Sequence, residues 1–287
     1  MNRILVTGVG GPAGKSVTAL LAERNYALIG VDMQPLMAQS YPFFRVPPAR
    51  HPEFLPAIAH LAEENEVDLI IPTVSEELPV FASQWDYGSC WPVMVSPAQA
   101  IATANDKYLT ALALVQHGVA VPYFMLPSQA RTPAIIKHTL GWPCISKPRI
   151  GRGGREVMLR YPADFESIRA LGDGYILQEF APGADYAPNV YSSFDGSDQV
   201  VVLEKTELKE GIVGNALSVR RVVDHAVGAA ALAAAKALDL LGPLDIDIRK
   251  RANGAPVVLE INARFGANIR QAPEILEAAL LQMELVR

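Results

Sequence analysis

The sequence predicts a mixed protein in which an α/β domain with a parallel sheet precedes a more irregular α+β region. Three observations support this prediction. Strand-like and helix-like segments alternate over residues 1–100, as they do in βαβ units. Later strand-like segments follow one another directly and are joined by short turns, as in hairpins. The chain has 287 residues, of which 50% are hydrophobic and 19% charged, so it can bury a sizeable core and is not expected to be disordered.

The composition excludes several classes of protein. A formal net charge of −5 argues against a general nucleic-acid binder, which needs a basic face. Two cysteines, Cys90 and Cys144, cannot form a disulfide framework or a Cys-based zinc site, and they suit a reducing compartment as buried small residues. There is no signal-peptide layout, and no apolar run reaches about 18 residues without a charge or a breaker. We therefore expect a cytoplasmic protein that binds neither nucleic acid nor membrane.

Residues 1–100 are predicted to form a parallel sheet covered by helices. Apolar runs predict buried strands at Ile4–Val9, Ala27–Val31, Leu69–Pro72 and Pro92–Val95. Helical periodicity fills Ala13–Glu23, Glu53–Glu64 and Glu76–Gln84.

The glycine-rich turn after the first strand allows two phosphate-binding interpretations. It fails as a P-loop, because five residues rather than four separate Gly8 from Gly14. As a dinucleotide fingerprint it fits better, since Gly8, Gly10 and Ala13 have the right spacing and Asp32 ends the next strand. The same glycines also suit a tight turn with close helix packing. An NAD(P)-binding oxidoreductase is therefore one alternative.

The segment Val67–Leu78 places hydroxyl and acidic side chains directly after a predicted strand. Because α/β sheets bind ligands at the carboxyl ends of their strands, these side chains are candidates for substrate contact. They equally suit a helix start, with Ser75 as N-cap and the acids Glu76 and Glu77 in the first turn.

Residues 97–118 are predicted to form a helical linker. Asn105 is expected to cap the helix that begins with Asp106 and Lys107. A lysine in a first helical turn opposes the helix dipole, which indicates a use for its charge.

A small α+β unit is predicted from Pro122 to Phe180. On its strand near residue 145, Lys147 shares a face with Ile145, so its ammonium leaves the edge of an apolar patch and suits a desolvated phosphate contact. The loop Arg149–Arg155 follows, and its glycines let backbone N–H groups approach an anion closely. A basic surface hairpin is the alternative.

Two strands near the C-terminus, Leu244–Lys250 and Pro256–Ala263, are predicted to pair around a turn at Asn253-Gly254. Strands near Pro188–Phe194 and Val200–Glu207 and an alanine-rich helix, Val223–Leu241, are expected to precede them.

Side chains two apart share a face of a strand, so this pair is predicted to gather polar groups. Asp245 and Asp247 point one way on the first strand, and Glu260, Asn262 and Arg264 share a face of the second. Leu259 and Ile261 are expected to point into a core. Two carboxylates and an amide with open positions suit Mg²⁺ that also binds phosphate oxygens. An ordinary hairpin with a solvated polar face is the alternative.

The ending VVLEINAR, preceded by an acid on the previous strand, resembles the metal-binding signature of the ATP-grasp superfamily, in its carbamoyl-phosphate-synthetase-like and amino-acid-ligase-like branch. The resemblance implies that Asp247 and Glu260 are Mg²⁺ ligands, with Asn262 as a further ligand. Asp245 is the fallback for Asp247, because many relatives carry Glu or Gln at that position. Arg264 would contact the transferred phosphate.

Other segments carry the same resemblance. Asp106-Lys107 resembles the helix start whose lysine contacts ATP phosphate, and Lys147-Pro148 with its glycine-rich loop resembles the mobile lid. The resemblance implies nucleotide contacts for the lid residues Arg152, Gly153 and Gly154. It also implies a hinge at Tyr175–Tyr186, where the backbone of Gln178, Glu179 and Phe180 meets adenine and Asp185 replaces the usual ribose-binding Glu.

Together these resemblances imply a Rossmann-like domain over 1–100, whose turn does not bind ATP. A helical linker and small ATP-grasp subdomain would follow over 101–180, and a C-terminal subdomain with the metal site over 181–287. ATP would lie between the two halves, with Mg²⁺ or alternatively Mn²⁺, and Lys147 and Arg264 would be catalytic. The implied activity is a ligase that activates a small carboxylate as an acylphosphate for attack by an amine. A small-molecule kinase is the alternative within the family, and homodimer formation stays open.

Overall fold

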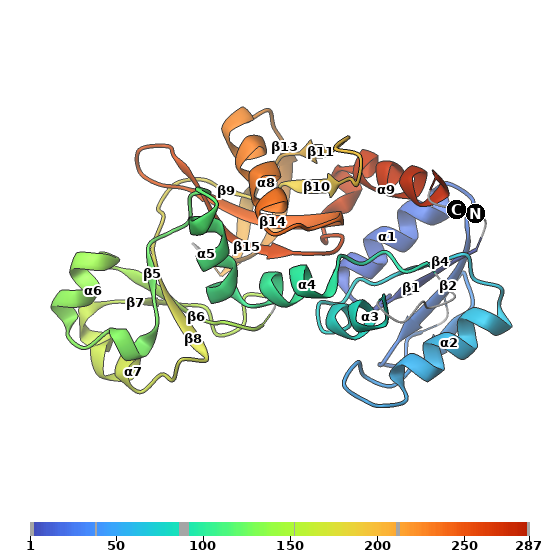
Figure 1. Cartoon of the computed structure of the whole chain (residues 1–287), viewed down its shortest axis with the longest axis horizontal. Coiled ribbons are helices and arrows are strands. Elements are labelled where there is room, and N and C mark those ends of the chain that lie inside the picture. Colours follow the sequence, from blue (N-terminus) through green and yellow to red (C-terminus); the bar gives the residue numbers. More distant parts are fainter. Residues whose placement is uncertain (1–2, 38, 86–91, 152, 211–212, 286–287) are drawn as a thin grey trace.

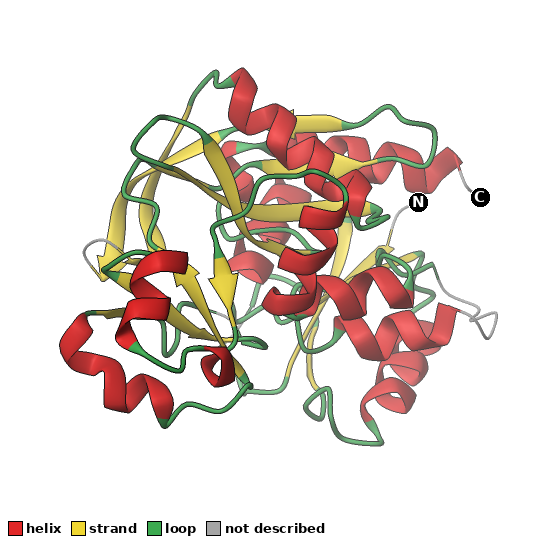
Figure 2. Cartoon of the chain, turned by 60° about the vertical axis from the view of Figure 1, so that its left-hand side comes forward, coloured by secondary structure: helices red, strands yellow, loops and turns green. Residues whose placement is uncertain are grey.

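The computed structural model describes residues 3–37, 39–85, 92–151, 153–210 and 213–285. Within these ranges the strands form three sheets (Figure 1). Figure 1 shows the N-terminal sheet with α1–α3 on the right, the small sheet with α6 and α7 on the left, and the large sheet above and between them. Figure 2 shows the same arrangement turned by 60°, with helices packed along the strands. No helix in these ranges is long and apolar enough to cross a membrane.

The N-terminal sheet is parallel, in the order β3-β2-β1-β4, which confirms the predicted α/β architecture. Its strands are β1 (Arg3–Thr7), β2 (Ala27–Asp32), β3 (Phe43–Arg45) and β4 (Leu69–Ile71). Its helices are α1 (Pro12–Glu23), α2 (Phe54–Glu64) and α3 (Leu78–Trp85).

Two segments at the edges of this sheet differ from the sequence prediction. Pro92–Val95 is not a strand, because only Val93 makes a parallel bridge, to Ile70. Proline has no N–H to donate, and Val95 bonds back to the carbonyl of Val93, which turns the chain away. The short strand β3 was not predicted; its two aromatic residues pair beside Gly30–Asp32.

The glycine-rich turn is explained by close packing. Gly8 has φ +61°, and a Cβ there would lie 2.3 Å from Val74 Cγ2. A Cβ on Gly14 would lie 2.3 Å from the carbonyl oxygen of Gly8. The Asp32 carboxylate accepts the N–H of Gly10 at 2.9 Å, so it closes the turn itself. These contacts account for the residues of the fingerprint without a dinucleotide.

The linker consists of two helices, α4 (Ala98–Asn105) and α5 (Lys107–Gln116). The N-cap of α5 is Asp106 rather than Asn105, since the Asp106 carboxylate accepts the backbone N–H groups of Tyr108 and Leu109. Lys107 is then the first helical residue.

The small sheet is antiparallel, in the order β5-β8-β6-β7. Its strands are β5 (Phe124–Met125), β6 (Cys144–Pro148), β7 (Met158–Arg160) and β8 (Tyr175–Glu179). The helices α6 (Pro133–Thr139) and α7 (Phe165–Arg169) and the 3-10 turns Pro127–Gln129 and Pro162–Asp164 accompany it. Cys144 lies in the apolar core of this unit, and burial raises the pKa of its thiol to about 12, as suits an inert core residue.

The large sheet runs in the order β11-β10-β14-β9-β12-β13, with β15 on the other edge of β14. Its strands are β9 (Asp185–Tyr186), β10 (Asn189–Ser192), β11 (Gln199–Val201), β12 (Leu203–Glu210), β13 (Val213–Arg221), β14 (Gly242–Lys250) and β15 (Pro256–Asn262). The helix α8 (His225–Ala237) lies inside the predicted range, and the 3-10 turn Ile269–Gln271 leads into α9 (Pro273–Leu285).

The β14–β15 pair contains a register shift that the sequence did not predict. Asp247 pairs with Glu260, but Ile248 pairs with Val258, so Leu259 is an extra residue on β15. Leu259 therefore does not point into the core as predicted. It lines a pocket instead.

The C-terminal segment packs against the N-terminal sheet. Ile4 and Val6 of β1 share one buried cluster with Phe265, Ile269 and Ile275. Ser16 on α1 donates a hydrogen bond to the carbonyl oxygen of Ala267 at 2.7 Å. Figure 1 shows α9 next to α1.

Candidate active site

A pocket lies between the small sheet and the β14–β15 pair, under the glycine-rich loop. Most of the predicted site residues line it: Lys107, Lys147, Gly154, Gln178, Glu179, Phe180, Asp185, Asp247 and Glu260. Gly153, Asn262 and Arg264 do not line it, and Arg152 lies outside the described residues.

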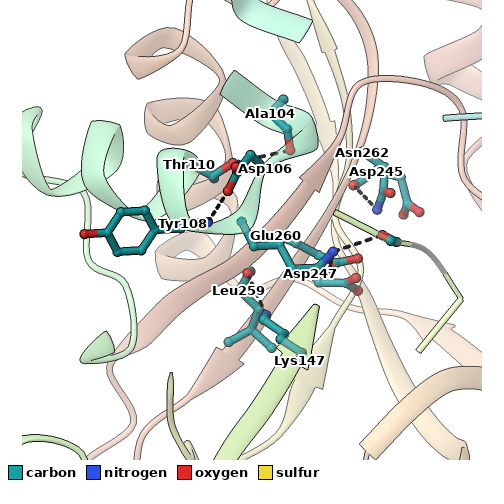
Figure 3. Close-up of polar contacts among 12 residues, drawn as sticks. Ala104, Asp106, Tyr108, Thr110, Lys147, Asp245, Asp247, Leu259, Glu260 and Asn262 are labelled. Atoms are coloured by element: carbon teal, nitrogen blue, oxygen red, sulfur yellow. Dashed lines mark hydrogen bonds and ion pairs between the residues drawn. The ribbon is translucent and has the colours of Figure 1, made fainter. Parts of the chain in front are cut away.

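Two carboxylates face each other across the strands at the base of this pocket. Asp247 on β14 stands opposite Glu260 on β15 (Figure 3). Burial raises the pKa of Asp247 to about 7, against the opposing pull of Lys205. Burial would also raise the pKa of Glu260, but the ammonium groups of Lys107 and Lys147 outweigh it and hold that pKa at about 2. The pair is therefore a strongly charged site whose acids need cations.

Lysines surround these acids. Lys107 Nζ lies 3.3 Å from Glu260 Oε2, and Lys205 bonds to Asp247 and lies 3.1 Å from Asp185 Oδ1. Burial would lower the pKa of Lys205, but its carboxylate partners raise it. In the protein without nucleotide, the lysines and carboxylates of the pocket thus neutralise one another's charge.

Lys147 is the most deeply placed of the three lysines and makes a different contact. Its Nζ donates to the carbonyl oxygen of Leu259 at 3.1 Å (Figure 3), a group that the bulge turns toward the pocket. Burial lowers the pKa of Lys147 to about 8, with Glu260 opposing the shift. A buried ammonium with one neutral acceptor has donors left for an anion.

The glycine-rich loop is tied to the start of α5. The carboxylate of Asp106, besides capping the helix, accepts the Nε and Nη2 hydrogens of Arg149. Lys107 Nζ donates to the carbonyl oxygen of Gly151 at 2.9 Å. Gly153 and Gly154 have φ +72° and +69°, a conformation that side chains disfavour. The loop therefore covers the pocket in a backbone conformation that needs glycine.

The acid of the hinge segment, Glu179, is held by other groups of the protein. The Glu179 carboxylate accepts from the guanidinium of Arg251 and, at 3.0 Å, from the backbone N–H of Tyr123. Burial would raise the pKa of Glu179, but these hydrogen bonds lower it. The carboxylate is thus occupied, and so is the Glu179 N–H, which donates to the carbonyl oxygen of Tyr123 at 2.8 Å.

We expect Arg251→Met to lower the free energy of unfolding by about 1–2 kcal/mol, because it leaves the partly buried Glu179 carboxylate short of a partner. The pKa of Glu179 is lowered on folding from its ordinary 4.5, so the contribution of the pair is complete above that value. It is lost as the pH falls through the lowered value. Urea unfolding from about pH 6 to about pH 3 should therefore show a smaller loss of stability in Arg251→Met than in wild type.

The pair of Arg220 with Glu204, in which the arginine is exposed and the carboxylate partly buried, offers a matched control. Arg220→Met should change stability little at either pH. An equal pH dependence in wild type and Arg251→Met would contradict the role assigned to the hinge pair.

Arg264 lies at the junction between β15 and the loop after β4. Its Nε donates to Ser75 Oγ at 3.1 Å and its Nη2 to Asn262 Oδ1 at 3.2 Å, and Asp245 Oδ2 is 3.9 Å from its Nη1. Ser75 thus contacts the segment that continues β15, and it is not the N-cap predicted from the sequence, because α3 begins only at Leu78. Gly266 lets Asp245 pack closely, because a Cβ there would lie 2.5 Å from the Asp245 carboxyl carbon.

The donor set fits a hard divalent cation that completes its shell with phosphate and water. Asp247 and Glu260 present carboxylates at one position, whereas the amide oxygen of Asn262, the further ligand expected from the sequence, lies outside the pocket lining and accepts from Arg264 Nη2. No group of three or more His, Cys, Asp or Glu side chains with metal-binding geometry occurs among the described residues. A small number of protein oxygen ligands is typical of Mg²⁺ that also binds phosphate, and not of a metal held by protein ligands alone.

Besides Arg155, which ends the predicted glycine-rich loop, two cations of the pocket were not among the predicted site residues. Lys205 comes from β12 and Arg249 from β14, and both line the pocket. Side chains alternate along β14, so Arg249 lies on the same face as Asp247. This placement could therefore have been predicted from the sequence. Lys205 is brought in by the pairing of β12 with β9, which no local pattern predicts.

Comparisons with known proteins agree with this geometry. A family model described as an ATP-grasp domain matches residues 104–268, more than half of the chain. No curated protein matches.

Several solved structures share the fold. An L-amino acid ligase from Bacillus licheniformis is 17% identical, with a TM-score of 0.70 over 98% of this chain and 74% of that chain. An N5-carboxyaminoimidazole ribonucleotide synthetase from Thermotoga maritima is 17% identical, with a TM-score of 0.73 over 99% and 76%. A biotin carboxylase from Campylobacter jejuni is 18% identical, with a TM-score of 0.73 over 99% and 71%. The chain therefore belongs to the ATP-grasp family, as the strand pair ending in VVLEINAR and the glycine-rich loop predicted.

Proposed function

We propose that this protein is an ATP-dependent ligase that activates a small carboxylate, an amino acid or a related acid, for attack by an amine. The observation that carries the proposal is the convergence of Lys107 and Lys147 with Asp247 and Glu260 in one pocket under a glycine-rich loop. Phosphoryl transfer needs positioning and charge neutralisation rather than a protein nucleophile, and the pocket is built of such groups. The similar L-amino acid ligase and N5-carboxyaminoimidazole ribonucleotide synthetase are consistent with a ligase.

In this proposal each part of the pocket has one task. The hinge backbone at Gln178–Phe180 receives adenine, and Asp185 receives the ribose hydroxyls. Lys107, Lys147 and the loop with Arg152, Gly153 and Gly154 hold the phosphates.

Asp247, Glu260 and Asn262 would hold Mg²⁺, which supplies charge neutralisation at the phosphates when bound. Arg264 would face the transferred phosphoryl group, with Ser75 and Asn262 holding its guanidinium in place.

The reaction proceeds in two steps. An oxygen of the substrate carboxylate attacks the γ-phosphorus of ATP, which forms an acylphosphate and releases ADP. The amine then attacks the acyl carbon, phosphate leaves, and the amine loses a proton. A closed loop would protect the acylphosphate from water.

We assign residues 1–100 to a Rossmann-like domain, 101–180 to the linker and small subdomain, and 181–287 to the C-terminal subdomain.

The experiment that tests this function is an ADP-release screen over pooled amino acids and small carboxylates with an amine pool, in which phosphate and product mass are followed together. ADP and phosphate in equal amounts with a condensed product support the ligase. ADP with a phosphorylated product and no free phosphate would indicate a kinase instead.

We also expect nucleotide binding to depend on Mg²⁺ and to favour ATP over NADPH, because Asp32 is already used to close the N-terminal turn. Isothermal titration calorimetry with each nucleotide, with and without Mg²⁺, checks this. Binding of NADPH without binding of ATP would contradict the ligase proposal and support an oxidoreductase.

A further inference from the structure

Arg249 is a buried cation at the hinge end of the pocket. It lies on β14 two residues after Asp247, and both side chains line the pocket. The residue is only 9% exposed. Its guanidinium lies over the ring of Phe180, 5.3 Å from the ring centroid. It therefore sits beside the segment that is proposed to receive adenine.

Asp185 stands directly opposite Arg249 on β9. Its Oδ2 is 3.5 Å from Arg249 Nε, and its Oδ1 is 3.1 Å from Lys205 Nζ. The carboxylate is thus bracketed by a cation at each oxygen. The last torsion of an aspartate is otherwise broad, so this bracket fixes the plane of the carboxylate.

The pair keeps unused hydrogen-bonding capacity. Arg249 Nε is buried and makes no hydrogen bond with the described residues, and the buried Asp185 Oδ1 has its ion pair with Lys205 and no further hydrogen bond among them. Each oxygen of a carboxylate can accept more than one hydrogen, so an oxygen in a pocket with a single ion-pair partner can also accept from a donor on a ligand. Adjacent hydroxyl groups are donors of this kind, and one carboxylate can accept from both.

We propose, on the basis of the ATP site above, that Arg249 is a positioning residue which holds Asp185 for the two ribose hydroxyls. Asp185 is one methylene shorter than a glutamate, so its reach depends on the direction in which its carboxylate is held. Arg249 sets this direction from one side and is itself fixed by its contact with Phe180. Selectivity for ribonucleotides over deoxyribonucleotides then depends on Arg249, although the residue acts through Asp185.

The test is calorimetric titration with Mg²⁺ and ADP, 2′-deoxyADP or 3′-deoxyADP, on wild type, Arg249→Met and Arg249→Lys. Wild type should bind ADP about tenfold or more tightly than either deoxy nucleotide, as expected for hydrogen bonds to a charged group. Arg249→Met should lose about tenfold in ADP affinity but little in affinity for either deoxy nucleotide. The ratio of the ADP affinity to the deoxy nucleotide affinity should therefore fall toward one. A residue that only packs the pocket wall would weaken all three nucleotides equally.

Two further variants complete the design. Arg249→Lys keeps the charge but not the planar fork over Phe180, so its preference should be intermediate even if Arg249→Met does not fold. Arg220→Met removes an exposed arginine of the same sheet and should keep the wild-type preference.

An unchanged preference for ADP over the deoxy nucleotides in Arg249→Met or Arg249→Lys overturns the inference about Arg249 but not the proposed function. So does equal binding of the three nucleotides by wild type. Wild type that binds none of them contradicts the proposed ATP-dependent function, and this inference with it.

Discussion

Glu260→Gln is expected to abolish turnover, with a loss of about 10³-fold or more, while the protein stays folded. The substitution keeps the volume of the side chain but removes the charge that the proposed Mg²⁺ site would need. It also removes the carboxylate beside Lys107, at 3.3 Å, so a modest loss of thermal stability is expected in the absence of nucleotide. ADP release under saturating ATP and Mg²⁺, with circular dichroism and a thermal melt, checks both expectations.

A matched substitution separates the local charge from a general effect on the sheet. Glu204→Gln removes another partly buried, ion-paired carboxylate from the large sheet, on β12, and should leave turnover unchanged. Near-normal turnover in Glu260→Gln would show that this carboxylate holds no metal. Unfolding of Glu260→Gln would show that its main task is to neutralise the buried lysines.

Lys147→Ala and Arg264→Ala are both expected to lower kcat by about 10²–10³-fold, the usual cost of losing one charge-assisted contact to developing charge. They should differ in their effect on ATP affinity. Lys147 lines the pocket and meets phosphates that already carry charge, so its loss should also weaken ATP binding. Arg264 lies outside the pocket lining, so its loss should leave the Kd for ATP nearly unchanged. Single-turnover ADP release and calorimetry together measure the two effects.

Arg264→Lys should restore only part of the activity. A point charge cannot replace a planar fork that contacts Ser75 and Asn262 and that, in the proposed function, would also contact phosphate oxygens. Normal kcat in Arg264→Ala would mean that this arginine only braces β15 against the loop after β4.

The opposition of Asp247 and Glu260 was predictable because it depends on local rules. Alternation along a strand puts each acid on a known face, and Gly254, with φ +83°, allows the tight turn that brings the strands together. The parallel N-terminal sheet was predictable for the same reason, since buried runs and helical periods alternate there.

Features that depend on long-range pairing were missed. The bulge at Leu259 adds one residue to β15, which no side-chain pattern reveals, and it changes both the direction of Leu259 and the partner of Lys147. Asn105 and Asp106 are equally good caps by composition. The contact of Asp106 with Arg149, 43 residues later, is a tertiary interaction that the sequence pattern does not encode.

The packing of Phe265 and Ile275 against the first strand has a consequence for synthesis of the chain on the ribosome. The strands of the N-terminal sheet are complete at Ile71, yet part of the apolar cluster around Ile4 is supplied by residues as late as Leu280. At about 5–20 residues per second, the 209 residues between Ile71 and Leu280 take roughly 10–40 s to translate. During that interval the nascent sheet exposes the part of its apolar surface that Phe265, Ile269 and α9 cover in the folded chain, and this is the surface that a chaperone would bind.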